Sequence, residues 1–517
     1  GMHIFKANPL IVEKLKEKGL LVKYAEFSHS YPHCWRCHKP LIFRATPQWF
    51  IDTMNEKLKS SVLRFSKDTQ WVPKWGETRF VNMIENRVDW CISRQRSWGV
   101  PIPSLVCEEC EEEFIDADFT DTLVEQIRKD STDIWFSKEL KDLEPGNIKC
   151  PSCGSAKLKK GSNILDVWFD SGVSWYAVVK KKMGEDVPVD MYLEGTDQYR
   201  GWFQSSMWPA AGITGSPPYK KVLTHGFSLD ANGRPMSKSR GNVISPLDVI
   251  KQYGAEILRL WVSSVDYTED FRFSHNVLKQ TVDTYKNIRN KLRFSLMNIE
   301  DFDPQKDQIE YSELLTLDRW ALNQLYILIN KLDSAYERFE FHKIYHLLTE
   351  FSTVTLSAQY FDMIKSRLYT SPSRSKERRS AQTVLFNMVK LLVQRMSPVL
   401  SFTAEEVFKY LFSEKESVFL ERWDDIPAEW AEWDRELDIM FELREKVQKI
   451  MEDLRANKEI GLSLDASLTL SFNNDKFEEI LNNFDLREFF IVSEVILEKD
   501  MKMSETYKID ISKAPGE

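Results

Sequence analysis

The chain has 517 residues, which is enough for three or four domains of ordinary size. Its net charge of −9 argues against indiscriminate binding to nucleic acid, but not against a local basic face. The sequence contains no run of about 18 apolar residues that would indicate a membrane span, and the residues after Met2 lack the pattern of a secretion signal. We therefore expect a cytoplasmic, monomeric protein without a membrane partner.

Shifts in composition and periodicity divide the chain into segments. Residues 1–40 predict a charged amphipathic helix, from Pro9 to Lys18, followed by a short strand. The six expected segments are 1–40, 41–105, 106–160, 161–275, 276–460 and 461–517.

The first cysteine pair of the chain is Cys34-x-x-Cys37, and the sequence offers it no second pair. Such a pair can be a redox centre, an accidental spacing or half of a metal site. His33 or His38 could supply a further ligand if the pair binds a metal. These interpretations stay open on the residues alone.

Two further pairs, Cys107-x-x-Cys110 and Cys150-x-x-Cys153, flank a polar stretch that is poor in strand signals. Each pair places two thiolates on one tight turn, and two such turns complete a tetrahedral zinc site with no open position. Reduced, unligated thiols and redox chemistry are the alternatives. The sequence predicts a structural Zn²⁺ in the segment 106–160.

Short apolar strands alternate with helices in residues 161–275, which predicts half of a parallel α/β sheet. In such sheets ligands bind at the carboxyl ends of strands, near a point where the strand order reverses. Three segments would meet there. They are Asp166–Gly172, Tyr192–Ser206 and His225–Ser239.

Polar side chains in these segments suit a ligand with an ammonium group and ribose hydroxyls. Glu194, Asp197 and Gln198 can accept hydrogen bonds from both, and Gly195 allows a close backbone approach. Trp168 offers a flat apolar wall. The plain alternative for any one acidic residue is a helix cap or a solvated side chain.

The third segment continues from a strand, Lys221 to Thr224, into a glycine-punctuated polar loop centred on Lys238. We expect this loop to be mobile. One ammonium flanked by the hydroxyls of Ser237 and Ser239 suits a polyphosphate that must be gripped and released. An ordinary surface turn would be the alternative for an isolated Ser-Lys-Ser.

Residues 276–460 carry long stretches of helical periodicity, for example Leu314 to Arg338 and Ala381 to Met396, and predict a helix bundle. The basic run from Lys365 to Arg379 is either a solvated loop or a face that meets RNA phosphate. Residues 461–517 alternate apolar and polar side chains and predict a small α+β appendage.

Pro235-Met-Ser-Lys-Ser239, preceded by His-Gly-Phe and Asp-x-x-Gly-Arg, resembles the Lys-Met-Ser-Lys-Ser signature of class I aminoacyl-tRNA synthetases. Pro235 replaces the first lysine of that signature. The run from Ser28 to Phe50 and all three strand-end segments resemble isoleucyl-tRNA synthetases. The resemblance extends from Ser28 to Leu470, and the sequences of these motifs fit the isoleucyl enzymes better than the valyl ones.

The resemblance implies a partial Rossmann-like sheet with a zinc-binding insert, followed by a helical anticodon-binding domain and a C-terminal junction domain. It implies that Glu194, Gly195, Asp197 and Gln198 bind the aminoacyl-adenylate, and that His225 and Gly226 lie at the adenine side. The remaining implied site residues are Trp168 and Trp202, which flank the aliphatic side chain, and the loop residues Met236, Ser237, Lys238 and Ser239, of which Lys238 neutralises the phosphates of ATP.

The implied reaction is attack of the L-isoleucine carboxylate on the α-phosphate of ATP, which is bound with Mg²⁺, followed by transfer to tRNA(Ile). The His-x-Gly-His signature of class I is absent. We therefore expect a fragment that is inactive alone, in which residues 1–40 are a remnant of the editing insertion and Cys34/Cys37 are half of a second zinc site. The alternatives are a valyl-tRNA synthetase fragment, a non-catalytic tRNA-binding paralogue and a zinc-dependent scaffold.

Overall fold

The computed structural model describes residues 2–34, 37–43, 45–237 and 240–515. Two compact units are present, and each is considered by itself. The first contains residues 1–56 and 87–170, and the second contains residues 57–86 and 171–517. None of the helices in the described ranges has both the length and the apolar composition that a bilayer span requires.

The first unit is built from short antiparallel pairings around a small sheet that carries the cysteine pairs. The amphipathic helix predicted from Pro9 to Lys18 is confirmed as α1 (Ile4–Glu17), none of whose residues is buried. The other paired elements of this unit are β1 (Phe50–Ile51) with β3 (Trp90–Cys91), β4 (Ser93–Arg94) with β8 (Ile164–Leu165), and the sheet β6-β5-β7 (Glu113–Ile115, Ser104–Cys107 and Leu158–Lys160).

The stretch between the two cysteine pairs folds over the sheet β6-β5-β7 and has its own apolar core, which includes Phe119, Leu123 and Trp135. Its helices are α4 (Ala117–Lys129), α5 (Ile134–Ser137) and the short 3₁₀ helix η1 (Leu140–Leu143). Asp116 caps α4 by accepting a hydrogen bond from the backbone N–H of Phe119. The insert is therefore a small folded body in which apolar packing supports the cysteine turns.

The second unit begins with a three-stranded parallel sheet in the order β2-β10-β9. The strands are β2 (Gln70–Val72), β9 (Val189–Gly195) and β10 (Tyr219–His225), so the predicted strand from Lys221 to Thr224 is confirmed as the centre of the sheet. The elements around it are α2 (Glu56–Asp68), α3 (Trp75–Glu85), α6 (Val167–Gly172, which crosses the boundary between the units), the π-helix η2 (Trp175–Met183), η3 (Thr196–Tyr199) and α7 (Trp202–Ile213).

Two helices and a short parallel pairing follow the sheet and lead to the bundle. Strand β11 (Ser228–Leu229) pairs with β12 (Phe271–Arg272), and α8 (Pro246–Tyr253) precedes α9 (Ala255–Ser264). The carboxylate of Glu256 accepts the backbone N–H of Thr403 at 2.9 Å, which ties α9 to the bundle helix α15 (Ser401–Leu411). Glu256 is buried, so this contact lies inside the joint between the sheet region and the bundle.

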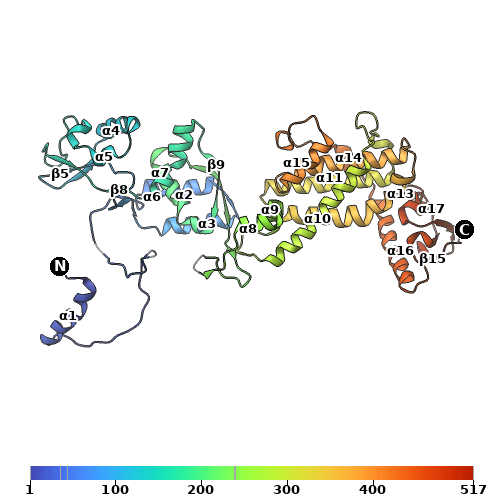
Figure 1. Ribbon diagram of the computed structural model, residues 1–517, viewed down its shortest axis with the longest axis horizontal. Coiled ribbons are helices and arrows are strands. Elements are labelled where there is room, and N and C mark those ends of the chain that lie inside the picture. Colours follow the sequence, from blue (N-terminus) through green and yellow to red (C-terminus); the bar gives the residue numbers. More distant parts are fainter. Residues whose placement is uncertain (1, 35–36, 44, 238–239, 516–517) are drawn as a thin grey trace. The chain divides into compact units, whose positions relative to one another are not determined.

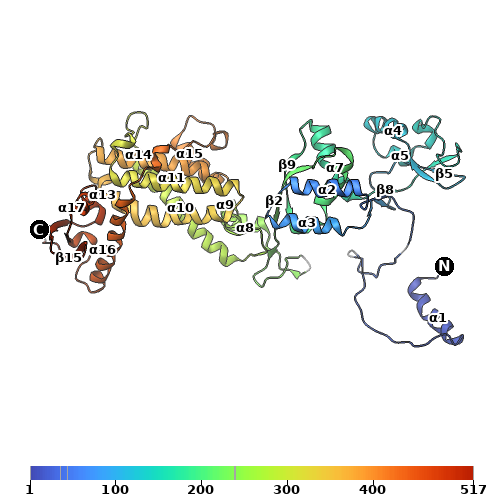
Figure 2. The same cartoon turned by 180° about the vertical axis from the view of Figure 1, so that it is seen from behind.

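Helical periodicity in the sequence predicted helices of the bundle. The stretches Leu314–Arg338 and Ala381–Met396 are confirmed as α11 (Thr316–Glu337) and α14 (Lys376–Met396), which run side by side with α10 (His275–Asn298) in Figures 1 and 2. Helix α14 has buried residues on all of its faces, as expected for a central helix. The other helices are α12 (Phe341–Glu350), the π-helix η6 (Phe351–Phe361), α13 (Asp362–Thr370), α16 (Ile439–Ala456) and the short turns η5 (Tyr311–Glu313), η7 (Val418–Leu420), η8 (Ala428–Ala431), η9 (Arg435–Asp438) and η10 (Ser463–Asp465).

The C-terminal appendage is a three-stranded sheet in the order β14-β13-β15, coloured red in Figure 1. Its alternating sequence forms β13 (Ala466–Phe472) and β15 (Tyr507–Lys513), which pair antiparallel, while β14 (Glu494–Lys499) runs parallel to β13. Helices α17 (Asp475–Leu481) and α18 (Leu486–Phe490) complete it. Its buried side chains belong to the same hydrophobic core as those of the bundle.

Candidate active site

The carboxyl ends of β9 and β10 place two of the predicted site segments side by side. In the parallel register Glu194 lies opposite Thr224, and Gly195 lies opposite His225. Parallel pairing brings the ends of both strands to one edge of the sheet, which is where ligands bind in open α/β folds. Glu194 is exposed at this edge, so its carboxylate is accessible to a ligand.

Gly195 keeps this edge open. A Cβ atom added there would lie 2.7 Å from an Oδ atom of Asp197 and 3.6 Å from the ring of His225. A larger residue would therefore push Asp197 away from the position that it occupies at the start of η3. The structure brings Gly195, Asp197 and His225 together, as the sequence predicted.

The side-chain amide of Gln198 is already engaged within the protein. Its Nε2 donates to Asp197 at 2.9 Å, and its Oε1 accepts the backbone N–H of Trp202 at 3.0 Å. These contacts fix the side chain of Gln198 between η3 and the start of α7. They also leave the carboxylate of Asp197 as the more accessible acceptor of the two.

A buried pair behind this edge was missed by sequence reasoning. The hydroxyl groups of Tyr199 and Thr224 are 3.1 Å apart and join η3 to β10. Burial raises the pKa of Tyr199, so this hydroxyl stays protonated at neutral pH. The only signal available in the sequence was the position of both residues beside the predicted ligands.

The predicted amino-acid pocket residues belong to different units. Trp202, in the second unit, stacks on Tyr192 with ring centroids 3.8 Å apart, and its Nε1 donates to the backbone oxygen of Ser171 at 2.9 Å. One face of the Trp202 ring is therefore covered by protein. Trp168 is 43% exposed in the first unit. A pocket formed by both tryptophans stays a prediction.

His225 and Gly226, which are predicted to bind the ligand, also make contacts that shape the end of β10. The Nδ1 atom of His225 lies 2.8 Å from the backbone oxygen of Gly226. The N–H of Gly226 donates to the backbone oxygen of Tyr267 at 2.8 Å, and an added Cβ would come within 2.3 Å of the backbone of Glu269. Only glycine fits between the end of β10 and this neighbouring segment.

The loop after β11 lies partly within the described residues. Met236 is half-buried and packs against the apolar cluster of α8 and α9 that includes Val249 and Ile257. The backbone N–H of Ser237 donates to Oδ1 of Asn242 at 2.9 Å. Lys238 and Ser239 lie outside the described residues, so their predicted roles are not tested.

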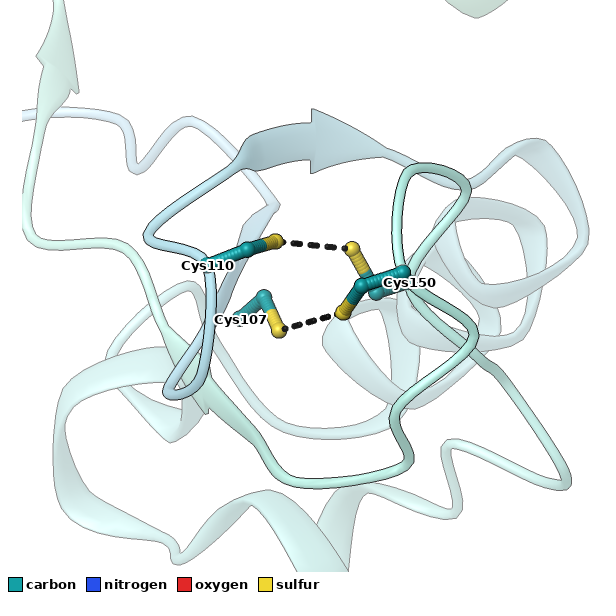
Figure 3. Close-up of side chains that lie close together, drawn as sticks. Cys107, Cys110 and Cys150 are labelled. Atoms are coloured by element: carbon teal, nitrogen blue, oxygen red, sulfur yellow. Dashed lines mark hydrogen bonds between the residues drawn. The ribbon is translucent and has the colours of Figure 1, made fainter.

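Four cysteines of the first unit form a compact group, as predicted. The Sγ atoms of Cys107, Cys110, Cys150 and Cys153 all lie within 4.8 Å of one another. The distance from Cys107 to Cys153 is 3.6 Å and that from Cys110 to Cys150 is 3.5 Å, and Figure 3 shows the labelled side chains pointing toward one another from two turns. These separations exclude disulfides, whose sulfur atoms are about 2.05 Å apart. They are close to the ~3.8 Å that four ligands at about 2.3 Å from a tetrahedral zinc require.

The two cysteine turns have the same backbone construction. The N–H of Glu111 donates to the oxygen of Cys107, and that of Gly154 donates to the oxygen of Cys150. Both donors have positive φ angles, of 62° and 74°. The backbone N–H of Cys110 is the main cause that lowers the pKa of Cys107 to about 7, whereas the pKa of Cys110 is raised to about 12, because the backbone N–H of Glu112, which lowers it, is outweighed by the contacts with the neighbouring thiols, Cys150 foremost. Cys107 is therefore the first thiol of the group to reach the thiolate form that metals bind. The donor set therefore fits a tetrahedral metal such as zinc.

The pair Cys34/Cys37 stands on a turn of the same kind. The N–H of His38 donates to the oxygen of Cys34 at 2.8 Å, and His38 has a φ of 55°. Within the described ranges, no group of three or more potential ligands forms around this pair. Its assignment as half of a metal site stays a prediction, and His33 and His38 do not complete such a site among these residues.

The interpretation of the basic run from Lys365 to Arg379 as a solvated loop or an RNA face is wrong for three of its arginines. The guanidinium of Arg367 is 5% exposed and lies 2.7 Å from Asp318 and 2.7 Å from Glu488. Arg378 and Arg379 pair with Asp301 at 3.0 and 3.5 Å, and Arg379 also contacts Asp307 at 3.3 Å. These cations hold the bundle together, because each one compensates a carboxylate on another part of the chain.

Comparison with known proteins agrees with this geometry. The model of the family described as tRNA synthetases class I (I, L, M and V) matches residues 12–274. The chain belongs to this family. A second model, described as the anticodon-binding domain of tRNA ligase, matches residues 318–470, which cover most of the bundle and reach β13. The class I catalytic fold, followed by a helical region, is therefore confirmed.

Similar curated proteins are isoleucine–tRNA ligases. That of Petrotoga mobilis is 47% identical over 502 residues, which is 96% of this chain and 55% of that protein. Those of Kosmotoga olearia and Syntrophotalea carbinolica are 44% and 46% identical over the whole chain, which covers 57% of each. The predicted resemblance to isoleucyl-tRNA synthetases is confirmed. The chain spans little more than half the length of these relatives.

Solved structures show the same fold at low sequence identity. Methionyl-tRNA synthetase of Mycobacterium tuberculosis in complex with methionyl-adenylate aligns with a TM-score of 0.50 and 14% identity. The alignment covers 75% of this chain and 72% of that structure. At this identity the likeness supports the fold alone.

Proposed function

We propose that the chain is part of an isoleucine–tRNA ligase and carries the second half of its catalytic site together with its anticodon-binding domain. The observation that carries the proposal is the identity of 44% to 47% with isoleucine–tRNA ligases along 96% to 100% of the chain. The grouping of Glu194, Asp197 and His225 at one sheet edge supports it, because the predicted ligand-binding segments meet there.

The proposed first step needs no covalent enzyme nucleophile. A carboxylate oxygen of L-isoleucine attacks the α-phosphorus of ATP, the bond to the β-phosphate breaks, and pyrophosphate leaves. Glu194 and Asp197 would hold the ammonium group and the ribose hydroxyls, and Lys238 would balance the phosphate charge. Mg²⁺, which the family uses with ATP, would share that charge. Catalysis then rests on positioning and on charge stabilisation.

The proposed second step transfers the isoleucyl group to tRNA(Ile). A ribose hydroxyl at the 3′ end of the tRNA attacks the adenylate carbonyl, and AMP leaves. The bundle would hold the anticodon end of the tRNA, in keeping with the family model that matches residues 318–470. We assign a structural Zn²⁺ to the four-cysteine cluster, since two identical turns complete a closed tetrahedral set.

Aminoacylation tests this proposal. The chain would be joined to the part of the Petrotoga mobilis enzyme that it does not match, and charging of tRNA(Ile) and tRNA(Val) transcripts would be measured with isoleucine and valine. We expect charging of tRNA(Ile) rather than tRNA(Val), with a preference for isoleucine over valine. Isoleucine is larger than valine by one methylene group, which changes the binding free energy by only about 1–3 kcal/mol. Isoleucyl enzymes are themselves the usual example of this limit.

The outcomes separate the alternatives. Charging of tRNA(Val) with valine would assign the chain to the sister enzyme. If the joined protein charges neither tRNA but still retards tRNA in a gel, the chain is a tRNA-binding protein without a catalytic role.

A further inference from the structure

A hydrogen-bonded relay connects the two sides of the loop that carries Lys238. Oδ2 of Asp230 accepts from Nδ2 of Asn242 at 2.8 Å, and Oδ1 of Asn242 accepts the backbone N–H of Ser237 at 2.9 Å. Nδ2 of Asn242 also lies 3.2 Å from the backbone oxygen of Pro235. One amide side chain therefore bridges the carboxylate before the loop and the backbone directly before Lys238.

Asp230 is itself held in place by the turn that follows β11. Its Oδ1 accepts the backbone N–H groups of Asn232 and Arg234, both at 2.9 Å, and its own N–H donates to the oxygen of Arg234 at 2.9 Å. Gly233 permits this turn with a φ of 74°. Hydrogen bonds from Asn242 and from the Arg234 and Asn232 amides lower the pKa of Asp230, so the carboxylate is an ionised acceptor at neutral pH.

The relay acts on a segment that is also held by apolar packing and by a backbone hydrogen bond. Met236 packs against the cluster of α8 and α9, and the N–H of Arg240 donates to the oxygen of Ser237 at 3.1 Å. The contact with Asn242 uses the N–H of Ser237, and the contact with Arg240 uses its carbonyl oxygen. Both backbone groups of Ser237 are thus engaged before a ligand arrives.

We propose that Asp230 and Asn242 are positioning residues that hold the backbone of Ser237 and so fix the base of the Lys238 loop for the triphosphate of ATP. This inference rests on the proposed function. A backbone that is already held at Ser237 reduces the conformational entropy that ATP binding must offset at this position. Asp230 and Asn242 act through Ser237 and need not touch ATP.

The chemistry of the relay allows a swap that separates its role from plain stability. Asn242→Asp sets a second carboxylate against Asp230. In Asp230→Asn, neither orientation of the Asn242 amide can hydrogen-bond both to the new amide nitrogen at position 230 and to the N–H of Ser237. The double variant with both changes restores the order of donor and acceptor from position 230 to Ser237, but it loses the hydrogen bond to the backbone oxygen of Pro235. In it, the new amide at position 230 would donate to the new carboxylate at position 242, and that carboxylate would still accept from Ser237. The charge of the loop is unchanged in the double variant.

The direct readout is hydrogen exchange at the Ser237 amide in this chain alone, followed with the two single variants and the double variant. Asn232→Asp is the matched control for Asn242→Asp, since it adds the same charge to the same turn and leaves the three side-chain hydrogen bonds of Asn242 in place. We expect protection to fall about tenfold or more in each single variant, to recover in part in the double variant and to persist in the control. Unchanged protection in both single variants would overturn the relay.

The functional readout is ATP–pyrophosphate exchange by the joined protein. We expect each single variant to raise the KM for ATP about tenfold, with the KM for isoleucine unchanged and with partial recovery in the double variant. A loss of folded protein would lower kcat and leave both KM values in place. Lost protection with an unchanged KM for ATP would overturn the positioning role and leave the proposed function standing. A parent without exchange would overturn the proposed function, while amide protection would still decide the relay.

Discussion

Cys107 and Cys150 occupy equivalent positions in two turns of the same construction, and the second cysteine of each turn supplies the remaining thiols. The sequence predicted this group well, because a Cys-x-x-Cys spacing places both sulfurs on one turn whatever the rest of the chain does. The sequence could not predict the apolar core of the insert, which includes Trp135 and supports the turns.

We expect Cys150→Ser to remove the bound metal. The purified chain should contain about one zinc ion, and the variant should contain almost none, since a closed site needs all four ligands. Elemental analysis measures this directly. Cys91→Ser, which lies outside the cluster, is the control and should retain the metal. Equal zinc contents in both variants would contradict the assignment.

Glu488 shows how a single buried carboxyl can couple stability to pH. Burial raises its pKa from 4.5 to about 7, although Arg367 beside it acts in the opposite direction. A pKa that is higher in the folded chain means that the native state binds more protons than the unfolded state. The free energy of unfolding therefore falls as the pH rises from about 4.5 to about 7.

We expect Glu488→Gln to remove this part of the pH dependence. Urea unfolding gives the free energy of unfolding at pH 5 and at pH 8. The value at pH 5 minus the value at pH 8 should be smaller in the variant than in the parent by about 1–3 kcal/mol. Glu479→Gln, at an exposed glutamate of α17, should leave the difference as it is in the parent. The same difference in all three proteins would show that Glu488 does not titrate in this range.

At the scale of elements, the segment from Lys365 to Arg379 shows where sequence reasoning failed. Its composition predicted a solvated loop or an RNA face, yet most of it lies at the end of α13 and the start of α14. The acids that pair with Arg367, Arg378 and Arg379 are far away in sequence, so no local pattern marked Arg367 and Arg379 as buried. Strand β2 was missed for a related reason, because three residues between two helices carry little periodic signal.

We expect Arg367→Met to destabilise the chain by about 3–5 kcal/mol, because it leaves Asp318 buried without its cation. Arg374→Ala, at an exposed arginine between α13 and α14, should change stability by less than about 0.5 kcal/mol. Chemical denaturation measures both. A small effect at both positions would contradict the structural role of Arg367 and would revive the solvated-loop interpretation.

At the scale of the whole molecule, the sequence predicted the class of fold and the order of its parts. Periodicity identified α11 and α14, and alternation identified β13 and β15, because each follows from one local period. The position of Glu194 and His225 at the same edge of the sheet followed from the general rule for parallel sheets. The relay from Asp230 to Ser237 could not be predicted, since it depends on the turn that brings Asn242 back across the loop.

The measurement that tests the central claim most directly is isoleucine-dependent ATP–pyrophosphate exchange by the chain mixed with the part of the Petrotoga mobilis enzyme that it does not match. Valine and leucine serve as amino-acid controls. Lys238→Ala is compared with Lys502→Ala, which lies in a Lys-Met-Ser run of the appendage. We predict exchange that appears only on mixing, prefers isoleucine and falls by about 10²–10³-fold in Lys238→Ala alone. Exchange that prefers valine, or that is equal in both lysine variants, would contradict the account.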